Sequence, residues 1–270
     1  MKTRPSRPSF RRGRIALSAV CAFASLATSR PAEACTNFLV TRGASVDGST
    51  MITYSADSHV RYGELYFRRG GTWPAGSTVK LFDRGDSRPL GEIPQAAKTY
   101  NVIGFMNENQ VAIGESTFGG RKELEDKTGV VDYGSLMFLS MDRARTARDA
   151  IRIIAELVAE HGYASTGESF SIGDPDEVWI MEIIGKGTDP VLDQKSNRQV
   201  NRDKGAVWVA IRIPDGQISA HANHARITTF PLENGTTSIS SRHLEKLSDP
   251  RVEVVYSLSL IHISEPTRPY

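Results

Sequence analysis

The stretch PAEACTNFLVT, residues 31–41, places a cysteine directly after an Ala-x-Ala sequence and at the start of an apolar, β-rich run. Ala32 and Ala34 occupy the −3 and −1 positions of a signal-peptidase cleavage site. Cleavage after Ala34 would make Cys35 the first residue of the mature chain, with a free thiol and a free α-amino group. The stretch therefore predicts both export and a candidate nucleophile at Cys35.

The segment before this site has the features of a secretory signal peptide. Residues 1–14 are basic and contain no Asp or Glu, and residues 15–28, IALSAVCAFASLAT, are apolar. This apolar run is shorter than the roughly 20 residues that a membrane-spanning helix needs. We therefore expect residues 1–34 to be removed during export to the periplasm or the exterior, which leaves no stable membrane anchor.

The composition is typical of a soluble protein with a hydrophobic core. Of the 270 residues, 39% are hydrophobic and 24% are charged. The 33 Lys and Arg residues and the 31 Asp and Glu residues give a formal charge of +2, and much of the excess lies in the basic start. Because the remainder is near neutral, nucleic acid is not an expected partner.

The cysteine content restricts the chemistry that is open to the chain. Cys21 and Cys35 are the 2 cysteines, too few for a disulfide framework or a cysteine-built zinc site. A thiol with a pKa of about 8.5 is mostly protonated at neutral pH, and an α-amino group with a pKa of about 7.7–8 can accept its proton. Two other interpretations stay open: Cys35 as a buried small hydrophobic residue, or as the acylated cysteine of a lipid-anchored binding protein, whose blocked amine could not act as a base.

Strand patterns dominate the chain after Cys35. The Asp47-Gly48 turn signal separates residues 36–41 from residues 50–54 and predicts a hairpin that starts at the cysteine. We predict further strands at residues 100–106, 110–114, 135–139, 168–172, 178–184, 206–213 and 217–220. The spacing predicts a β-rich core built largely of hairpins.

One helix is clearly signalled. Thr146 is a candidate N-cap, apolar residues follow on one stripe, and Gly162 is a stop signal. This helix should pack on the sheet. Residues 70–94, rich in Gly and Pro, predict a long excursion rather than a domain linker.

Several short motifs follow one another along the chain. They are Cys35-Thr-Asn-Phe-Leu-Val, Ala44-Ser-Val-Asp-Gly-Ser49, Ala56-Asp57-Ser58, Met106-Asn107-Glu108, Gly114-Glu115-Ser-Thr-Phe-Gly-Gly120, Asp132-Tyr-Gly-Ser135 and Gly167-Glu-Ser-Phe170. Together they resemble the cysteine dipeptidases of the dipeptidase A family, which are N-terminal-nucleophile hydrolases distantly similar to penicillin V acylase and bile salt hydrolase. The resemblance runs from Cys35 to about residue 231. It implies an α+β fold, a four-layer αββα sandwich, in which Cys35 opens a central strand and attacks a peptide carbonyl.

The resemblance also implies roles for other residues. Asp57 matches the acid that orients the nucleophile and its amine, and Tyr54 stands where the wider superfamily often has Arg. Asn223, directly after a strand candidate, matches the Asn whose side-chain amide stabilises the oxyanion. A backbone N–H near Thr117, in a Gly-flanked loop, would be the second donor.

Other polar residues carry weaker signals. His59, His221 and His224 lack the pattern of a metal site, so we expect neither a metal nor an organic cofactor. Three carboxylates are candidates for binding the free amine of a dipeptide, although surface or turn positions explain each equally well: Glu115, Glu168 and Glu182.

The end of the chain breaks the pattern. Residues 257–270, SLSLIHISEPTRPY, resemble translated adaptor sequence, and a native but atypical tail is the alternative. The predicted organisation is therefore a signal peptide at 1–34, a partial hydrolase domain at 35–256 and a non-native tail at 257–270.

The sequence as a whole predicts an exported cysteine dipeptidase that hydrolyses short peptides through a thioester on Cys35. The alternatives are an amidohydrolase of the penicillin V acylase or bile salt hydrolase type, and the lipid-anchored binding protein. Substrate recognition separates the two enzymes, because a dipeptidase must recognise charged peptide termini and an acylase an apolar acyl group. Nothing in the sequence indicates an oligomeric state.

Overall fold

The computed structural model describes residues 35–57, 63–227 and 237–241. The predicted signal peptide and the predicted non-native tail lie outside the described residues. So does His59.

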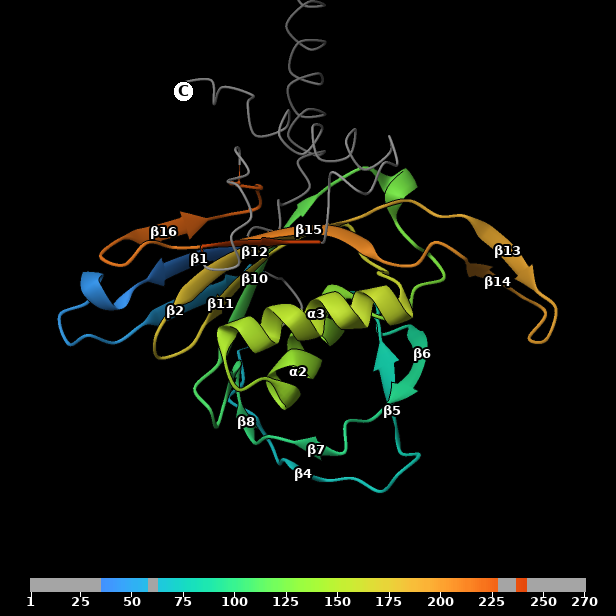
Figure 1. Ribbon diagram of the computed structural model, residues 1–270, viewed down its shortest axis with the longest axis horizontal. Coiled ribbons are helices and arrows are strands. Elements are labelled where there is room, and N and C mark those ends of the chain that lie inside the picture. Colours follow the sequence, from blue (N-terminus) through green and yellow to red (C-terminus); the bar gives the residue numbers. More distant parts are fainter. Residues whose placement is uncertain (1–34, 58–62, 228–236, 242–270) are drawn as a thin grey trace, which may run out of the picture. The chain divides into compact units, whose positions relative to one another are not determined.

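The described chain has an α+β fold that consists mostly of sheet (Figure 1). Its large sheet has eight antiparallel strands. In spatial order they are β17 (Ser238–Ser240), β15 (Ala206–Arg212), β12 (Val178–Gly185), β11 (Gly167–Gly173), β10 (Ala112–Gly119), β9 (Met106–Asn107), β8 (Val102–Ile103) and β3 (Phe67–Arg68). Strands β8, β9 and β10 follow one another as hairpins, and β11 and β12 form another, as the spacing predicted. The connection from β10 to β11 instead contains both helices, and the connection from β12 to β15 contains two further strands.

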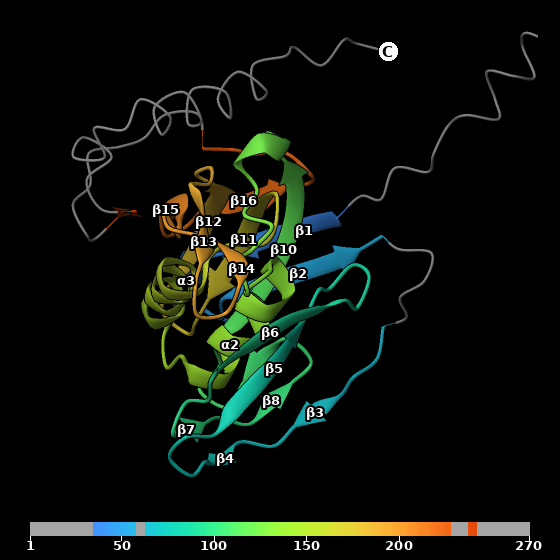
Figure 2. The ribbon, with the colours of Figure 1, turned by 90° about the vertical axis from the view of Figure 1, so that its right-hand side faces the viewer.

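A second sheet has three strands and begins at the cysteine. Its order is β16 (Ile218–His221), β1 (Cys35–Val40) and β2 (Met51–Ala56). Strands β1 and β2 pair antiparallel with Cys35 opposite Ala56, so the predicted hairpin is confirmed. The turn between them contains a short 3₁₀ helix, η1 (Arg42–Ala44). Figure 2 shows β1 and β2 beside β10 of the large sheet.

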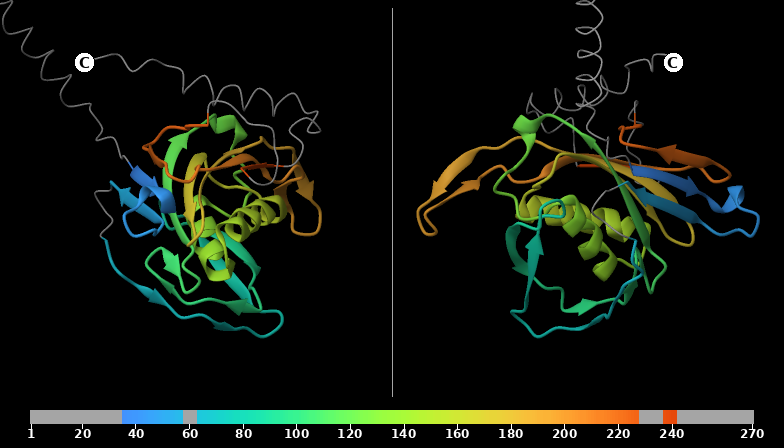
Figure 3. Two further views of the ribbon diagram at one scale, coloured as in Figure 1. Left: turned by 60° about the vertical axis from the view of Figure 1, so that its left-hand side comes forward. Right: turned by 180° about the vertical axis from the view of Figure 1, so that it is seen from behind.

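The remaining strands form three small two-stranded sheets at the periphery. They are β4 (Gly71–Thr72) with β7 (Lys98–Thr99), β5 (Thr78–Phe82) with β6 (Pro89–Pro94), and β13 (Pro190–Asp193) with β14 (Arg198–Asn201). The predicted excursion over residues 70–94 thus contains ordered strands. Figure 3 shows the β13–β14 hairpin extending from one end of the large sheet, with β1 and β2 at the other.

Helix α3 (Ala147–His161) follows the sequence signals closely. The Thr146 Oγ1 atom accepts a hydrogen bond from the N–H of Asp149 at 3.1 Å, and Gly162 ends the helix with a φ of 76°. The left-handed conformation at Gly162 carries no Cβ penalty. The predicted helix and both of its caps are confirmed.

Helix α2 (Tyr133–Arg143) corrects a prediction, because residues 135–139 were expected to form a strand. The Asp132 side chain accepts a hydrogen bond from the N–H of Ser135 at 2.8 Å and caps the helix. An apolar run of this length is compatible with a buried strand and with a buried helix. The N-cap at Asp132 favours the helix. A short 3₁₀ helix, η2 (Lys122–Leu124), precedes α2.

The predicted strand at residues 100–106 was also too long. It covers β8 and the first residue of β9, and a turn separates these two short strands. The predicted strands at 110–114, 168–172, 178–184, 206–213 and 217–220 correspond to β10, β11, β12, β15 and β16.

An apolar core lies on each face of the large sheet. Trp179 and Met181 of β12 pack with α2 and α3 in the larger core. Val178 and Ile180 of the same strand pack with Leu39 of β1 in the smaller core. Successive residues of a strand point to opposite faces, so β12 is buried on both. The helices therefore cover one face of the large sheet, and the three-stranded sheet covers the other. Within the described ranges, no helix has the length and apolarity to cross a membrane.

Candidate active site

Cys35 lies at the first position of β1, half-buried, with polar groups around its backbone and side chain. Its N–H donates a hydrogen bond to Asn223 Oδ1 at 2.6 Å. Its carbonyl oxygen accepts one from Ser116 Oγ at 3.3 Å. Both ends of the residue are therefore fixed by side chains from other parts of the chain.

Asn223 links Cys35 to β10. The Asn223 side-chain amide donates to the carbonyl oxygen of Thr117 at 2.6 Å, and its backbone N–H donates to Ser116 Oγ at 2.7 Å. Asn223 follows β16 and has a φ of 45°, a left-handed conformation that Asn tolerates better than most residues. The structure thus brings together Cys35, Thr117 and Asn223, three of the residues that the sequence singled out.

Asp57, the fourth residue singled out, lies just after β2 and is exposed. Its backbone N–H donates a hydrogen bond that lowers the pKa of the Cys35 thiol, while its negative charge raises that pKa. Its carboxylate accepts a hydrogen bond from Ser55 Oγ at 3.2 Å. The residue is therefore close enough to act on the cysteine, although its carboxylate faces solvent.

Tyr54 and Glu115 meet beside the thiol. The Tyr54 hydroxyl donates to Glu115 Oε1 at 2.5 Å, and the Cys35 thiol lies 3.9 Å from the same oxygen. Burial, followed by the charge of Glu115, raises the pKa of Tyr54, so the phenol stays protonated and remains a donor. A Cβ at Gly114 would lie 2.7 Å from Asn37 Oδ1 and 3.0 Å from Tyr54 Cβ. Only glycine allows this close approach of β1, β2 and β10.

Glu168 completes a buried carboxyl pair with Glu115. The two residues are 1% and 3% exposed, and Thr117 Oγ1 donates to Glu168 Oε2 at 2.9 Å. Burial raises the pKa of Glu168 well above its ordinary value, and the charge of Glu115 and a hydrogen bond between the two carboxyl groups raise it further. The Glu168 carboxyl group therefore releases its proton less readily than a free glutamate.

The surroundings of Cys35 make its thiol a weak acid. Burial, followed by the charges of Glu115 and Glu168, raises the pKa of the thiol to about 12. The thiolate is the nucleophilic form. At neutral pH this thiol therefore needs a base or a neighbouring positive charge before it can act as a nucleophile.

Glu182 and His221 lie apart from the thiol. Glu182 Oε1 accepts a hydrogen bond from the N–H of Ile227 at 3.1 Å and another from the N–H of Arg226. His221 Nε2 lies 2.8 Å from Ser171 Oγ. Of the candidate amine-binding carboxylates, Glu115 and Glu168 are next to Cys35, whereas Glu182 binds backbone. Within residues 35–57, 63–227 and 237–241, no group of three or more His, Cys, Asp or Glu side chains could hold a metal ion.

Sequence reasoning missed the positioning roles of Asn37 and Ser116. Asn37 is fully buried on β1 and donates to the carbonyl oxygen of Glu115 at 2.7 Å. Ser116 lies between Glu115 and Thr117 on β10 and points to the opposite face of the sheet. The run Gly114-Glu-Ser-Thr117 contains the signal, because polar residues on both faces of one strand are unusual in a core.

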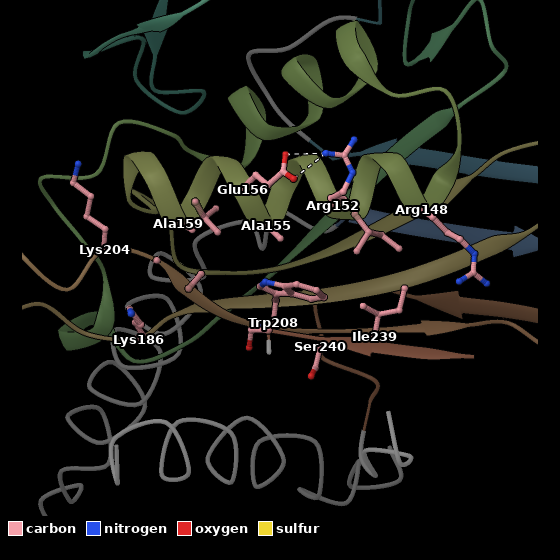
Figure 4. Close-up of a pocket in the computed structure, with 15 residues that line it drawn as sticks. Arg148, Arg152, Ala155, Glu156, Ala159, Lys186, Lys204, Trp208, Ile239 and Ser240 are labelled. Atoms are coloured by element: carbon pink, nitrogen blue, oxygen red, sulfur yellow. Dashed lines mark hydrogen bonds and ion pairs between the residues drawn. The ribbon is translucent and has the colours of Figure 1, made fainter. Parts of the chain in front are cut away.

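A hollow elsewhere in the molecule is separate from this cluster. A cavity of about 630 Å³ lies between α3 and strands β15 and β17, with Trp208 and Ile239 in its wall and charged side chains such as Arg152 around it (Figure 4). None of the residues around Cys35 described above lines it. It therefore does not enter the chemistry of the cysteine.

The family comparison covers most of the chain. The model of the family described as "Peptidase family C69" matches residues 34–68 and 74–252. The matched part begins one residue before Cys35 and includes the whole cluster of polar groups around it.

Comparison with curated proteins gives distant dipeptidases. A "Probable dipeptidase" of Latilactobacillus sakei is 27% identical over 217 residues, which cover 72% of this chain and 40% of the relative. A "Probable dipeptidase B" of Streptococcus pyogenes serotype M1 is 23% identical over 253 residues, with 87% and 46% covered. "Dipeptidase A" of Lactobacillus helveticus is 24% identical over 240 residues, with 80% and 45% covered. The chain thus spans less than half the length of these relatives.

Proposed function

Because this chain belongs to peptidase family C69, we propose that it is a cysteine-type dipeptidase whose nucleophile is Cys35. The observation that carries this proposal is the placement of Cys35 at the start of β1, with its backbone nitrogen on Asn223 Oδ1 and its thiol beside Glu115. The names of the curated relatives support a dipeptide as substrate.

Processing after Ala34 activates the cysteine in this proposal. In the unprocessed chain the Cys35 nitrogen is part of a peptide bond and cannot take a proton, and the thiol pKa of about 12 keeps sulfur protonated. Removal of residues 1–34 during export converts this nitrogen into an amine on the same residue. The amine accepts the thiol proton, and the resulting ammonium offsets the negative charge of Glu115.

The reaction is acyl transfer. The Cys35 sulfur forms a bond to the peptide carbonyl carbon while its proton passes to the α-amine. The C–N bond then breaks, the leaving amine takes that proton, and a thioester remains. Water attacks the thioester, releases the carboxylic acid and restores the thiol.

Asn223 and Thr117 are the proposed oxyanion donors. The Asn223 amide group has two N–H donors, and its contact with the Thr117 carbonyl uses one of them. The other is the proposed donor to the developing oxyanion, together with the backbone N–H of Thr117. Asp57 steadies the ammonium of Cys35 in this proposal, because its negative charge acts on the same residue.

The polar, acidic surroundings of the thiol favour a dipeptide over an apolar acyl group. The free ammonium of a dipeptide is two bonds from the attacked carbon, so it must lie close to the sulfur. Glu115 Oε1 is 3.9 Å from that sulfur and Glu168 is next to Glu115. These carboxyl groups are the proposed partners of the substrate ammonium. An acylase would need an apolar wall at this place.

The complete fold in this proposal is the four-layer αββα sandwich. The described helices, the large sheet and the small sheet supply three layers. The outer face of the small sheet exposes Phe38 by 49%, Met51 by 46% and Ile218 by 62%. Apolar side chains gathered on one face of a sheet favour a further covering layer.

The test begins with the secreted product. N-terminal sequencing should give Cys-Thr-Asn-Phe, and intact mass should show no acyl group on Cys35. Added acyl mass would support the lipid-anchored alternative, and an active enzyme with residues before Cys35 would contradict the role of the amine. The variant Ala34→Arg, which spoils the cleavage site, should stay unprocessed and inactive.

The thiol itself is tested by its reactivity and by substitution. Alkylation of Cys35 with iodoacetamide should be slow near pH 7 in the unprocessed form and fast in the processed form, and equal rates would contradict activation by processing. Cys35→Ser should keep the fold but lose about 10⁴-fold or more in kcat toward dipeptides, because a serine hydroxyl is a far weaker acid and a poorer nucleophile. Full activity in this variant would remove Cys35 from the mechanism.

A further inference from the structure

The segment that carries Asn223 has no regular secondary structure of its own. It runs from the end of β16 at His221 to Ile227. Its backbone N–H groups at residues 223, 226 and 227 donate hydrogen bonds to side chains on the large sheet. The position of Asn223 therefore depends on those side chains.

Two anchors hold the start of the segment on β10 and β11. Asn223 N–H donates to Ser116 Oγ at 2.7 Å, and His221 Nε2 lies 2.8 Å from Ser171 Oγ. Burial, followed by the charge of Arg226, lowers the pKa of His221 to about 4. This imidazole is therefore neutral in the range in which the enzyme should work.

A third anchor holds the end of the segment on β12. Glu182 is 7% exposed, and its Oε1 accepts the N–H groups of both Arg226 and Ile227. The Ile227 side chain is buried in the small core between the sheets. The carboxylate thus fixes the backbone three to four residues after Asn223.

We propose that Glu182 is a positioning residue that holds the Asn223 amide at Cys35 through the backbone of residues 226 and 227. The inference rests on the proposed function, because it gives this anchor a role in catalysis. Glu182 does not touch substrate in this arrangement. Its effect passes through a short segment that is anchored at both ends.

The anchor depends on pH. Burial raises the pKa of Glu182 to about 7, against an ordinary value of 4.5, while the two backbone N–H groups and the charge of Arg226 lower it. Its cross-strand neighbours are Ser169 and Val209, which carry no charge. A carboxylate accepts N–H groups more strongly than a neutral carboxyl group. The anchor therefore tightens as pH rises through about 7.

Stability changes in the opposite direction. Because the folded pKa lies above the ordinary value, the buried carboxyl group contributes most to stability below pH 4.5 and loses that contribution as pH rises to about 7. A stronger anchor and a weaker fold over one pH interval distinguish a positioning role from a purely structural one.

The experiment compares Glu182→Gln with the wild-type processed protein between pH 5.5 and pH 8.5. Glutamine keeps the shape and one acceptor but cannot ionise. At pH 8 its kcat for a dipeptide should be about tenfold lower with KM within about twofold, and near pH 6 the two proteins should converge. The variant should melt at a higher temperature than wild type at pH 8. Equal kcat at all pH values, or a loss confined to KM, would overturn the inference.

Two control variants test whether the change in kcat has a cause other than the loss of the Glu182 carboxylate. Glu156→Gln makes the same substitution at an exposed position of α3 and should change neither kcat nor its pH profile. His224 is an exposed titratable group on the segment itself. The difference between the wild type and the Glu182→Gln variant should persist when His224→Gln is added to both, and its disappearance would assign the pH effect to His224.

Hydrogen exchange tests the anchor without turnover. At pH 8 the amides of residues 223–227 should exchange about tenfold faster in Glu182→Gln, while those of α3 stay unchanged. Faster exchange in a protein whose wild type hydrolyses no dipeptide would remove the proposed function and leave the anchor in place. Unchanged exchange in a protein that does hydrolyse dipeptides would remove the anchor alone.

Discussion

The residues on the two faces of strand β12 make different kinds of contact. Trp179, Met181 and Ile183 point to the helices and are completely buried in the larger core. Glu182, on the opposite face, binds the backbone of the segment that carries Asn223. One strand therefore contributes to the stability of the fold through one set of residues and to the geometry of the site through the other.

The difference extends to the neighbouring strand. On β11, Phe170 and Ile172 face the helices, while Ser171 faces the small sheet and contacts His221. Apolar contacts tolerate small shifts of the residues that make them, whereas a hydrogen bond requires its two partners at fixed positions. On β12, substitutions of the helix-facing residues should thus lower stability, and substitution of Glu182 should lower kcat.

The largest expected effect is on the helix-covered face. Trp179→Ala should lower the free energy of unfolding by about 3–5 kcal/mol, because it removes a large buried ring and leaves a cavity. The kcat of the molecules that remain folded should stay within about twofold of the parent. Urea unfolding followed by circular dichroism gives the stability, and active-site titration of Cys35 gives the folded fraction.

Leu192→Ala is the matched control for this prediction. Leu192 is 55% exposed on β13, so its truncation should change the stability by no more than about 0.5 kcal/mol. A Trp179→Ala protein that unfolds normally but has lost its kcat would break the division between the two faces.

The next largest effect is expected at Asn223. Asn223→Ala should lower kcat by about 10²- to 10³-fold, or about 2.7–4 kcal/mol in the barrier, with a much smaller change in KM, because an oxyanion contact strengthens only in the transition state. Steady-state kinetics and a melting curve on the same preparation measure both quantities.

The backbone of Asn223 calls for a second variant. Alanine is strained at the φ of 45°, whereas glycine is not. Asn223→Gly should therefore match Asn223→Ala in kcat and be the more stable of the two. If either variant kept kcat within about threefold of the parent, Asn223 would not be an oxyanion donor.

The sequence allowed the local parts of this comparison to be predicted. The hairpin at Cys35 and the caps of α3 were correct, since turn and capping signals act over a few residues. The strand predicted at residues 135–139 was wrong, because only the hydrogen bond from Ser135 to Asp132 distinguishes its helix from a buried strand.

The site was predictable only in part. Cys35 and Asn223 are 188 residues apart, and no local pattern joins them, so their pairing depended on the resemblance to a family. The different surroundings of Glu168 and Glu182 could not be predicted at all. Both residues lie next to apolar strand residues in the sequence. Only tertiary packing places a second carboxyl group beside Glu168 and two backbone N–H groups beside Glu182.

The smallest expected effect is at the start of α3, on the helix-covered side. Thr146→Ala removes the hydroxyl that accepts the N–H of Asp149, and loss of an N-cap costs about 1 kcal/mol. The N–H of Ala147 keeps its own bond to Asp174 Oδ2 at 2.8 Å, so the helix start retains one of its two side-chain acceptors. For a domain of this size the melting temperature should fall by about 2–4 °C. Thr146→Ser, which keeps the hydroxyl, should restore the melting temperature.

Because α3 contacts the large sheet on the face opposite Glu182 and Asn223, kcat should be the same in all three proteins. A kcat that fell with the melting temperature and recovered in Thr146→Ser would mean that the two faces of the sheet are coupled and do not act separately.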